Sequence, residues 1–155
     1  MINKNIYSEV FDKTCSVCQK QIKKDIYDQG DCIYCGWKNN HFADQNPNSV
    51  LYPNLVSLSK AKQLFSEGKP FEPNLDEFIE ALHRYSEMQF EYAGVYYAVE
   101  LIYDKKKDTQ ISLYNSQTKE ISKFKNDDDF KFNAKIGNEY IKDIWEKTTD
   151  RYWLQ

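Results

Sequence analysis

The sequence has little of several features on which whole functional classes depend. Its 155 residues include five glycines and two histidines, and no apolar run approaches the roughly 20 residues of a membrane-spanning helix. The first residues, MINKNIYSEVFDK, lack the basic start and the apolar stretch of a signal peptide. We therefore expect a cytoplasmic protein that does not bind membranes.

Several enzyme signatures are missing as well. The sequence contains neither a Gly-x-Ser-x-Gly nucleophile turn nor a glycine-rich phosphate-binding loop. Glu80-x-x-His83 has the spacing of half a di-iron carboxylate site, but such a site needs this motif twice. We expect His83 to be an ordinary histidine on a helix surface. No catalytic residue is predicted, and an enzyme is the weaker expectation.

All four cysteines lie in two Cys-x-x-Cys pairs, in the segment CSVCQKQIKKDIYDQGDCIYCGW. In the reducing cytosol such pairs favour a metal site, with disulfides, a redox pair and an iron centre as the alternatives. A Cys-x-x-Cys turn directs two thiolates at one position, and the 13 residues between the pairs suffice for a hairpin that brings them together. We predict one structural Zn²⁺, whose ligands are Cys15, Cys18, Cys32 and Cys35.

The segment around the second pair resembles the cysteine-rich CPCC family of small bacterial proteins. The shared pattern, over about residues 15 to 66, runs from the cysteine pairs through Cys-Gly-Trp to a Ser-Leu-x-x-Ala-x-x-x-Phe helix. The first pair reads CSVC here, where that family usually has Cys-Pro-Cys-Cys or similar, and Lys-Asn-Asn replaces acidic residues after the tryptophan. The resemblance implies a zinc ribbon and no particular activity. The matching positions are Cys32, Cys35, Gly36, Trp37, Gln45, Asn46, Asn54, Ser57, Leu58, Ala61 and Phe65.

The charge of this ribbon, placed at residues 1–45, argues against nucleic acid as a partner. Six lysines face six acids, and four thiolates with one Zn²⁺ would add about two negative charges. Binding to a phosphate backbone requires a basic surface. A nucleic-acid-binding zinc ribbon therefore remains an alternative function only.

Residues 46–73 are predicted to form a loop and a connecting helix. Asn-Pro and Pro-Asn turn signals are followed by Ser57, a typical helix cap, and by apolar positions with a period of 3.6. Asn74 is the predicted cap of a second helix, LDEFIEALHRYSEM, over residues 74–88. This helix opens the third predicted segment of the chain.

Residues 74–155 are predicted to form an α+β domain. After the helix the hydrophobic period changes to two, which indicates four strands in QFEYAGVYYAVELIYDK, TQISLYN and KEISKFK. NEYIKDIWEKTTD places an apolar stripe on a closing helix over residues 138–149. The predicted fold is α+β: an N-terminal four-cysteine zinc ribbon, followed by helices and a four-stranded antiparallel meander covered by helices.

Aromatic residues are abundant, with twelve Tyr, nine Phe and three Trp. One small core cannot supply partners for so many phenol oxygens, so some tyrosines should be exposed. Half-exposed tyrosines are common in strands, and the three aspartates at 127–129 are explained by helix capping. The functional alternative is a protein-binding surface, with the candidate contacts Tyr96, Tyr103, Tyr114, Asp127, Asp128 and Asp129.

Residues 88–147 run from a Tyr-x-Gly-x-x-Tyr hairpin through an acidic helix start to Ile-x-Asp-Ile-Trp. In this pattern they are more loosely similar to small immunity-type modules of Gram-positive bacteria, some of which are encoded beside secreted toxins. This resemblance implies an immunity or antitoxin-like protein that neutralises its partner by stoichiometric binding. Residues 126–150 hold seven acids and four lysines, which would suit a basic toxin domain. The expected partner is another protein, such as a secreted toxin domain, and the alternatives are a nucleic-acid-binding ribbon and a small enzyme.

Overall fold

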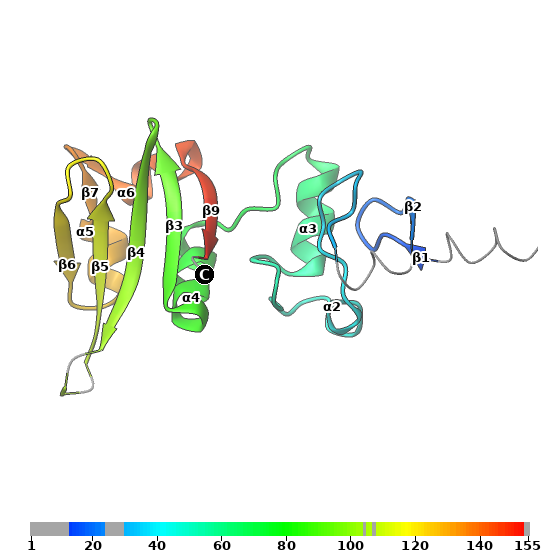
Figure 1. Ribbon diagram of the computed structural model, residues 1–155, viewed down its shortest axis with the longest axis horizontal. Coiled ribbons are helices and arrows are strands. Elements are labelled where there is room, and N and C mark those ends of the chain that lie inside the picture. The colour runs from blue at the N-terminus through cyan, green and yellow to red at the C-terminus, as the bar shows by residue number, and fades with distance from the viewer. Residues whose placement is uncertain (1–12, 24–29, 104, 107, 154–155) are drawn as a thin grey trace, which may run out of the picture. The chain divides into compact units, whose positions relative to one another are not determined.

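The chain divides into two compact units, residues 1–71 and residues 72–155. The first unit carries the four cysteines, and the second carries helices and an antiparallel sheet (Figure 1). The mixture of helix and sheet expected for an α+β protein is confirmed. Within the described part of the chain, no helix combines the length and apolarity needed to cross a membrane. This computed structural model describes residues 13–23, 30–103, 105, 106 and 108–153.

Two short hairpin turns form the cysteine-containing part of the first unit. β1 (Lys13–Thr14) pairs antiparallel with β2 (Gln21–Ile22) and closes the first turn. An isolated bridge between Asp31 and Lys38 closes the second turn. In both turns the residue before a Cys-x-x-Cys pair faces the third residue after it, so the two turns share one register.

Two helices complete the first unit. α2 (His41–Gln45) is capped by Asn40, whose side chain accepts a hydrogen bond from the third helical residue. α3 (Leu58–Ser66) is capped by Ser57, as predicted. The buried side of α3 packs into one apolar cluster with both cysteine turns, which therefore have a core of their own. This cluster contains Cys15, Val17, Ile22, Cys32, Trp37, Ala43, Val56, Leu58, Ala61 and Leu64.

The second unit contains a five-stranded antiparallel sheet in the order β6-β5-β4-β3-β9 (Figure 1). The first four strands form the predicted meander. The prediction of only four strands is wrong, because the C-terminal segment pairs with β3 along the edge that the meander leaves open. The strands are β3 (Glu87–Tyr92), β4 (Val95–Tyr103), β5 (Thr109–Asn115), β6 (Ile121–Phe124) and β9 (Thr149–Trp153).

The predicted closing helix over residues 138–149 is shorter in the structure and is preceded by a small hairpin. It ends before Thr148, which has an extended backbone. The β-branched Thr149 and the aromatic Tyr152 and Trp153 favour a strand, which pairs with β3, whereas the Thr148 amide donates to the Trp145 carbonyl at 3.0 Å. The elements of this segment are β7 (Lys135–Ile136), β8 (Glu139–Tyr140), α6 (Ile141–Ile144) and the 3-10 turn η1 (Trp145–Lys147).

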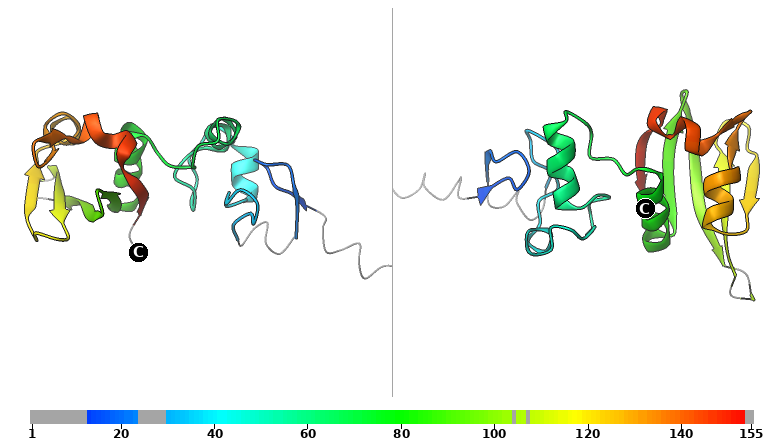
Figure 2. Two further views of the ribbon diagram at one scale, coloured as in Figure 1. Left: turned by 90° about the horizontal axis from the view of Figure 1, so that it is seen from above. Right: turned by 180° about the vertical axis from the view of Figure 1, so that it is seen from behind.

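Helices cover one face of the sheet and leave the other face open. α4 (Leu75–Tyr85), α5 (Asp127–Asn133) and α6 all lie on the same side of it (Figure 2). On this side Trp145 of η1 packs edge-on against Phe78 of α4, with 4.9 Å between ring centroids, so the closing segment and α4 meet as expected. The opposite side of the sheet has no covering layer among the described residues of the second unit. We call it the open face.

Candidate metal centre and binding surface

Two equivalent turns present the four cysteines. In the first turn the Cys15 amide donates to the Lys20 carbonyl at 2.9 Å, and the Gln19 amide donates to the Cys15 carbonyl at 3.0 Å. The second turn repeats both bonds, at 2.8 and 2.7 Å, with Cys32 and Gly36 in the places of Cys15 and Gln19. Gln19 and Gly36 both have left-handed backbones, with φ of 63° and 79°. Each turn thus holds its two cysteines in the same rigid conformation.

The sulfur positions fit a tetrahedral metal ion. The ligand atoms of the four cysteines all lie within 4.8 Å of one another. The Cys15 and Cys35 sulfurs are 3.7 Å apart, and so are those of Cys18 and Cys32. A tetrahedron with Zn–S bonds of about 2.3 Å has edges of about 3.8 Å, whereas a disulfide bond measures about 2.05 Å. The four thiols are free, and their spacing is compatible with a single metal ion bound by both turns.

Asn39 connects the two turns beside the sulfurs, although its side chain is only 3% exposed. Its amide nitrogen donates to the Cys15 sulfur at 3.4 Å, and its amide oxygen accepts from the Ser16 backbone at 2.9 Å. Hydrogen bonds of this kind orient a ligand and stabilise its charge. Asn39 was not predicted from the sequence, where its position two residues after the Cys-Gly-Trp motif was the available signal.

The electrostatics of the cluster also favour a cation. Burial by itself raises the pKa of the Cys15 thiol, but hydrogen bonds from the Asn39 side chain and from backbone amides outweigh burial, so this pKa lies below its ordinary value. Burial raises the pKa of Cys35 and of Cys18, and the neighbouring Cys15 thiolate raises both further. Without a cation, these surroundings favour the thiolate at Cys15 and disfavour it at Cys18 and Cys35. A divalent metal would stabilise all four.

The predicted partner-binding residues do not share one surface. Neighbouring residues along a strand point to opposite faces. Tyr96 and Tyr114 lie on the open face, whereas Tyr103, 66% exposed, has the parity of the buried residues of β4. The aspartates at 127–129 lie on α5, on the helix-covered side. The structure therefore brings only two of the six together on the open face.

The open face carries a row of side chains that crosses all five strands. Tyr114 faces Ile121 of β6 on one side and Ala98 of β4 on the other, and the row continues through Gln89 to Tyr152 of β9. Ile121 is 61% exposed and Tyr152 is 43% exposed. Tyr96, two residues along β4 from Ala98, is 44% exposed and donates to Asp150 at 3.2 Å. We call the five residues that cross the sheet the aromatic row.

Two of the three aspartates of α5, Asp127 and Asp129, have structural partners. Asn126 caps the helix by accepting from the Asp129 amide, and the Asp129 carboxylate accepts from the Lys125 amide at 2.8 Å. This backbone hydrogen bond and a second one from Asn133 hold the pKa of Asp129 below its ordinary value. A carboxylate oxygen of Asp127 lies 2.7 Å from the Nε2 atom of His83, which is the distance of a hydrogen bond or an ion pair. Capping thus accounts for Asp129, and His83 lies exposed on the surface of α4, where it contacts Asp127.

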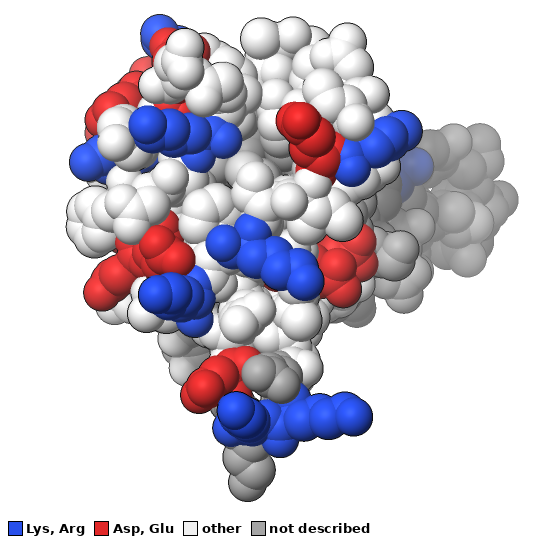
Figure 3. All heavy atoms as spheres, turned by 90° about the vertical axis from the view of Figure 1, so that its left-hand side faces the viewer, with Lys and Arg blue, Asp and Glu red and all other residues white. Residues whose placement is uncertain are grey.

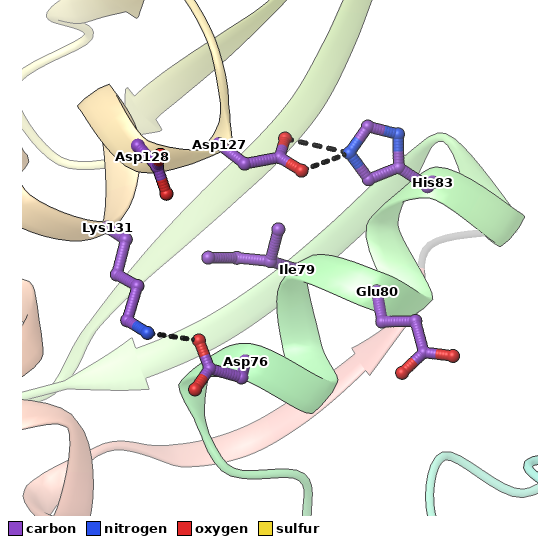
Figure 4. A pocket seen from close by; sticks show the side chains of 7 residues that line it. All are labelled: Asp76, Ile79, Glu80, His83, Asp127, Asp128 and Lys131. Atoms are coloured by element: carbon purple, nitrogen blue, oxygen red, sulfur yellow. Dashed lines mark hydrogen bonds and ion pairs between the residues drawn. The ribbon is translucent and has the colours of Figure 1, made fainter.

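Asp127 and His83 belong to a hollow of about 370 Å³ between α4 and α5 (Figure 4). Lys131 pairs with Asp76 across it at 2.5 Å. The lining contains no hydroxyl or thiol that the His–Asp pair could activate as a nucleophile. Among the described residues, only the four cysteines form a cluster with metal-binding geometry. The hollow is lined by Asp76, Ile79, Glu80, His83, Asp127, Asp128 and Lys131.

Two features therefore carry functional information: the four-cysteine cluster in the first unit and the open face in the second. The cluster points to a metal ion that holds two turns together. The open face presents aromatic and apolar side chains to solvent. Comparison with protein-family models, with curated proteins and with solved structures finds no match to this chain.

Proposed function

We propose that this protein acts by stoichiometric binding to another protein, in the manner of an immunity or antitoxin-like protein. The open face of the five-stranded sheet is the observation that carries the proposal. Tyr114, Tyr152 and Ile121 stand in one row on this face, while the opposite face is packed under helices. A partner that covered the row would remove its apolar surface from water.

The composition of the row supports a protein partner. Tyrosine offers a large, rigid contact area with few rotatable bonds, and aromatic residues are enriched at the buried centres of interfaces. Contiguous apolar patches on monomeric proteins frequently mark interaction sites. The aromatic row supplies two tyrosines and an exposed isoleucine, with Ala98 and the polar Gln89 between the two tyrosines.

The charge distribution supports a protein partner over nucleic acid. On the side of the second unit next to β6, lysine and acidic side chains are interspersed and form no basic patch (Figure 3). The chain as a whole has a formal net charge of −3. Binding to a phosphate backbone depends on clustered Lys and Arg side chains.

We assign a structural role to the metal. Four cysteine ligands complete the coordination of Zn²⁺ and leave no position for a substrate. Both turns belong to the apolar cluster of the first unit, so a metal that joins them would stabilise that unit's fold. Tetrahedral thiolate sites bind zinc or iron. Zn²⁺ is the proposed ion, because it is redox-inactive and therefore suits a purely structural role.

Co-expression with a candidate partner tests the proposed function. The candidate is the product of a neighbouring gene for a secreted toxin domain. We expect a 1:1 complex in size-exclusion chromatography with light scattering, and rescue of growth. The double variant Tyr114→Ala, Tyr152→Ala should weaken the complex. Tyr103→Ala is the matched control, because Tyr103 points to the opposite face of the sheet, and it should leave the complex intact. Absence of both co-elution and rescue would reject the immunity function, and binding to nucleic acid at physiological salt would replace it.

A further inference from the structure

We infer that the open face recognises a cationic side chain of its partner, an arginine or a lysine, between Glu87 and Glu100. This inference rests on the proposed function and adds the chemistry of the partner. The partner it specifies is a protein segment in which a basic residue is flanked by apolar ones. The feature that carries it is the pairing of β3 with β4.

Glu87 of β3 lies directly opposite Glu100 of β4 in the antiparallel ladder. Both residues are exposed on the open face. Residues that face each other in this way have Cβ atoms about 4.5–5.5 Å apart, and like charges in such a pair destabilise a sheet. Two carboxylates this close provide two acceptors for one guanidinium or ammonium group.

The described residues supply no cation for this pair, since neither carboxylate forms an ion pair with any of them. On the next strand Glu100 faces the neutral Ser112, and Lys123 follows only on β6, beyond it. Two strand spacings amount to about 10 Å, and among the described residues no ion pair joins the Lys123 ammonium to the Glu100 carboxylate. On the helix-covered side, by contrast, Asp76 has Lys131 at 2.5 Å.

The glutamate pair lies next to the aromatic row. Gln89 and Ala98, the central members of the row, are each two residues along the strand from Glu87 and Glu100. Two residues of a strand span about 6.8 Å. A side chain whose charged end contacts the glutamates could therefore place its aliphatic part, and the apolar residues beside it, on the row.

The net negative charge of the open face also favours a basic protein partner. Four acids lie on the open face, Glu87, Glu91, Glu100 and Asp150, against two lysines, Lys123 on β6 and Lys119, whose ammonium lies 5.9 Å from the centre of the Tyr114 ring. A negative face of this kind attracts a basic protein and repels a phosphate backbone. A second copy of this acidic chain is disfavoured for the same reason.

Peptide titration followed by NMR tests the inference without a known partner. The full chain, labelled with ¹⁵N and loaded with Zn²⁺, is titrated with acetyl-Leu-Arg-Leu-amide. Acetyl-Leu-citrulline-Leu-amide, of equal shape and no charge, is the matched probe. We expect the arginine peptide to shift the amide resonances of β3, β4 and β5 around the glutamate pair, and the citrulline peptide to bind at least fivefold more weakly.

Variants locate the contact. Glu87→Gln with Glu100→Gln should raise the Kd of the arginine peptide at least fivefold. Glu80→Gln with Asp128→Asn removes the same charge from the hollow between α4 and α5 and should leave the Kd unchanged. Equal binding by the first pair of variants and the parent protein, or shifts centred on the hollow, would overturn the inference. An open face that takes up no peptide, because the first unit or a second copy covers it, would overturn it too.

The two proposals fail separately. If a toxin partner forms its 1:1 complex but the arginine peptide does not bind at the glutamate pair, the proposed function is supported and this inference is rejected. If the peptide binds at the pair and no protein partner is found, the chemistry of the face stands and the immunity function falls.

Discussion

At the scale of single residues, the two cysteine turns differ at one informative position. Gln19 and Gly36 occupy the same left-handed site, and a side chain at Gly36 would meet no atom within 4 Å. The two positions therefore differ in backbone strain and in one exposed hydrogen bond, which the Gln19 side chain donates to the Ser16 carbonyl at 3.0 Å. We expect Gln19→Gly to stabilise the first unit by up to about 1 kcal/mol and Gly36→Gln to destabilise it by about 1 kcal/mol. Denaturant unfolding monitored by metal release measures both, and equal signs for the two changes would contradict the equivalence of the turns.

Asn39 gives a prediction for metal affinity. Asn39→Ala removes the donor to the Cys15 sulfur and the acceptor for the Ser16 amide. Loss of such a partner typically weakens metal binding about 10–100-fold. Competition with a chromophoric chelator measures the loss. Asn40→Ser, which retains a side-chain cap for α2, is the control and should retain the parent affinity.

Glu87 gives a prediction for stability in the absence of any partner. Glu87→Gln removes one charge of the like-charged pair with Glu100, so the free protein should gain about 1–4 °C in the Tm of the second unit. The gain should shrink at high salt, because salt already screens the repulsion. Glu80→Gln is the control, since Glu80 lies 3.8 Å from the guanidinium of Arg84 instead of facing a second acid. A salt-independent gain, or a loss of stability, would argue against repulsion.

At the scale of elements, the sequence was most informative where a pattern is local. Alternation predicted the four meander strands, and Ser57 and Asn74 marked the starts of α3 and α4. β9 was missed because its partner, β3, lies about 60 residues earlier in the chain, and periodicity does not report pairing over that separation. The sequence analysis groups Tyr103 with Tyr96, but the two residues are seven positions apart on one strand, and an odd spacing puts them on opposite faces of the sheet.

Among the candidate sites, too, those formed by residues close in sequence were predictable and those formed by distant residues were not. The four cysteines were predictable because their spacing encodes the geometry of the site within 21 residues. The glutamate pair was not, because a cross-strand contact depends on register. The His83–Asp127 pair joins two helices whose packing no single-sequence pattern fixes.

β9 is fastened by one side chain, Arg151, which is almost fully buried. Its guanidinium donates to the Trp145 carbonyl at 2.6 Å, to Pro73 at 3.0 Å and to Thr148, and it lies 3.7 Å from a Glu72 oxygen. β9, η1 and the segment before α4 are thereby joined. The planar group makes several bonds that an ammonium cannot reproduce.

Arg151→Lys should therefore destabilise the second unit by about 2–4 kcal/mol, since several buried carbonyls lose their donors. Thermal and urea unfolding measure the change. Amide exchange should show β9 and η1 exposed before the meander strands. Lys123→Arg, an exchange on the exposed face of β6, is the control and should have little effect. Uniform loss of protection across the sheet would mean that Arg151 does not act on β9 in particular.

At the scale of the whole molecule, the two units have separate cores. The first depends on an apolar cluster that includes two of the cysteines, and the second on the aromatic contacts between α4, β3 and η1. Metal binding at the four cysteines would therefore add to the folding free energy of the first unit.

Metal removal should thus unfold one unit and spare the other. Chelation, or Cys32→Ser, is expected to abolish amide protection in residues 13–23 and 30–71, while β3, β4 and β5 stay protected. Hydrogen exchange read by residue checks this, and elemental analysis should give one zinc per chain. Protein purified without added metal that contains neither zinc nor iron would contradict the metal centre, and simultaneous loss of the sheet would contradict separate units.

The two cysteine turns have the same conformation but different surroundings, and this difference predicts which turn releases the metal first. A tetrahedral ion does not distinguish the turns, but their surroundings do. The first turn is anchored by Asn39 and by the Ser16 hydroxyl, which donates to Asp44 at 2.5 Å. In the second turn the two residues between the cysteines, Ile33 and Tyr34, are largely exposed. We expect the second pair of thiolates to dissociate first, so that an incoming chelator meets Cys35 before it meets Cys15.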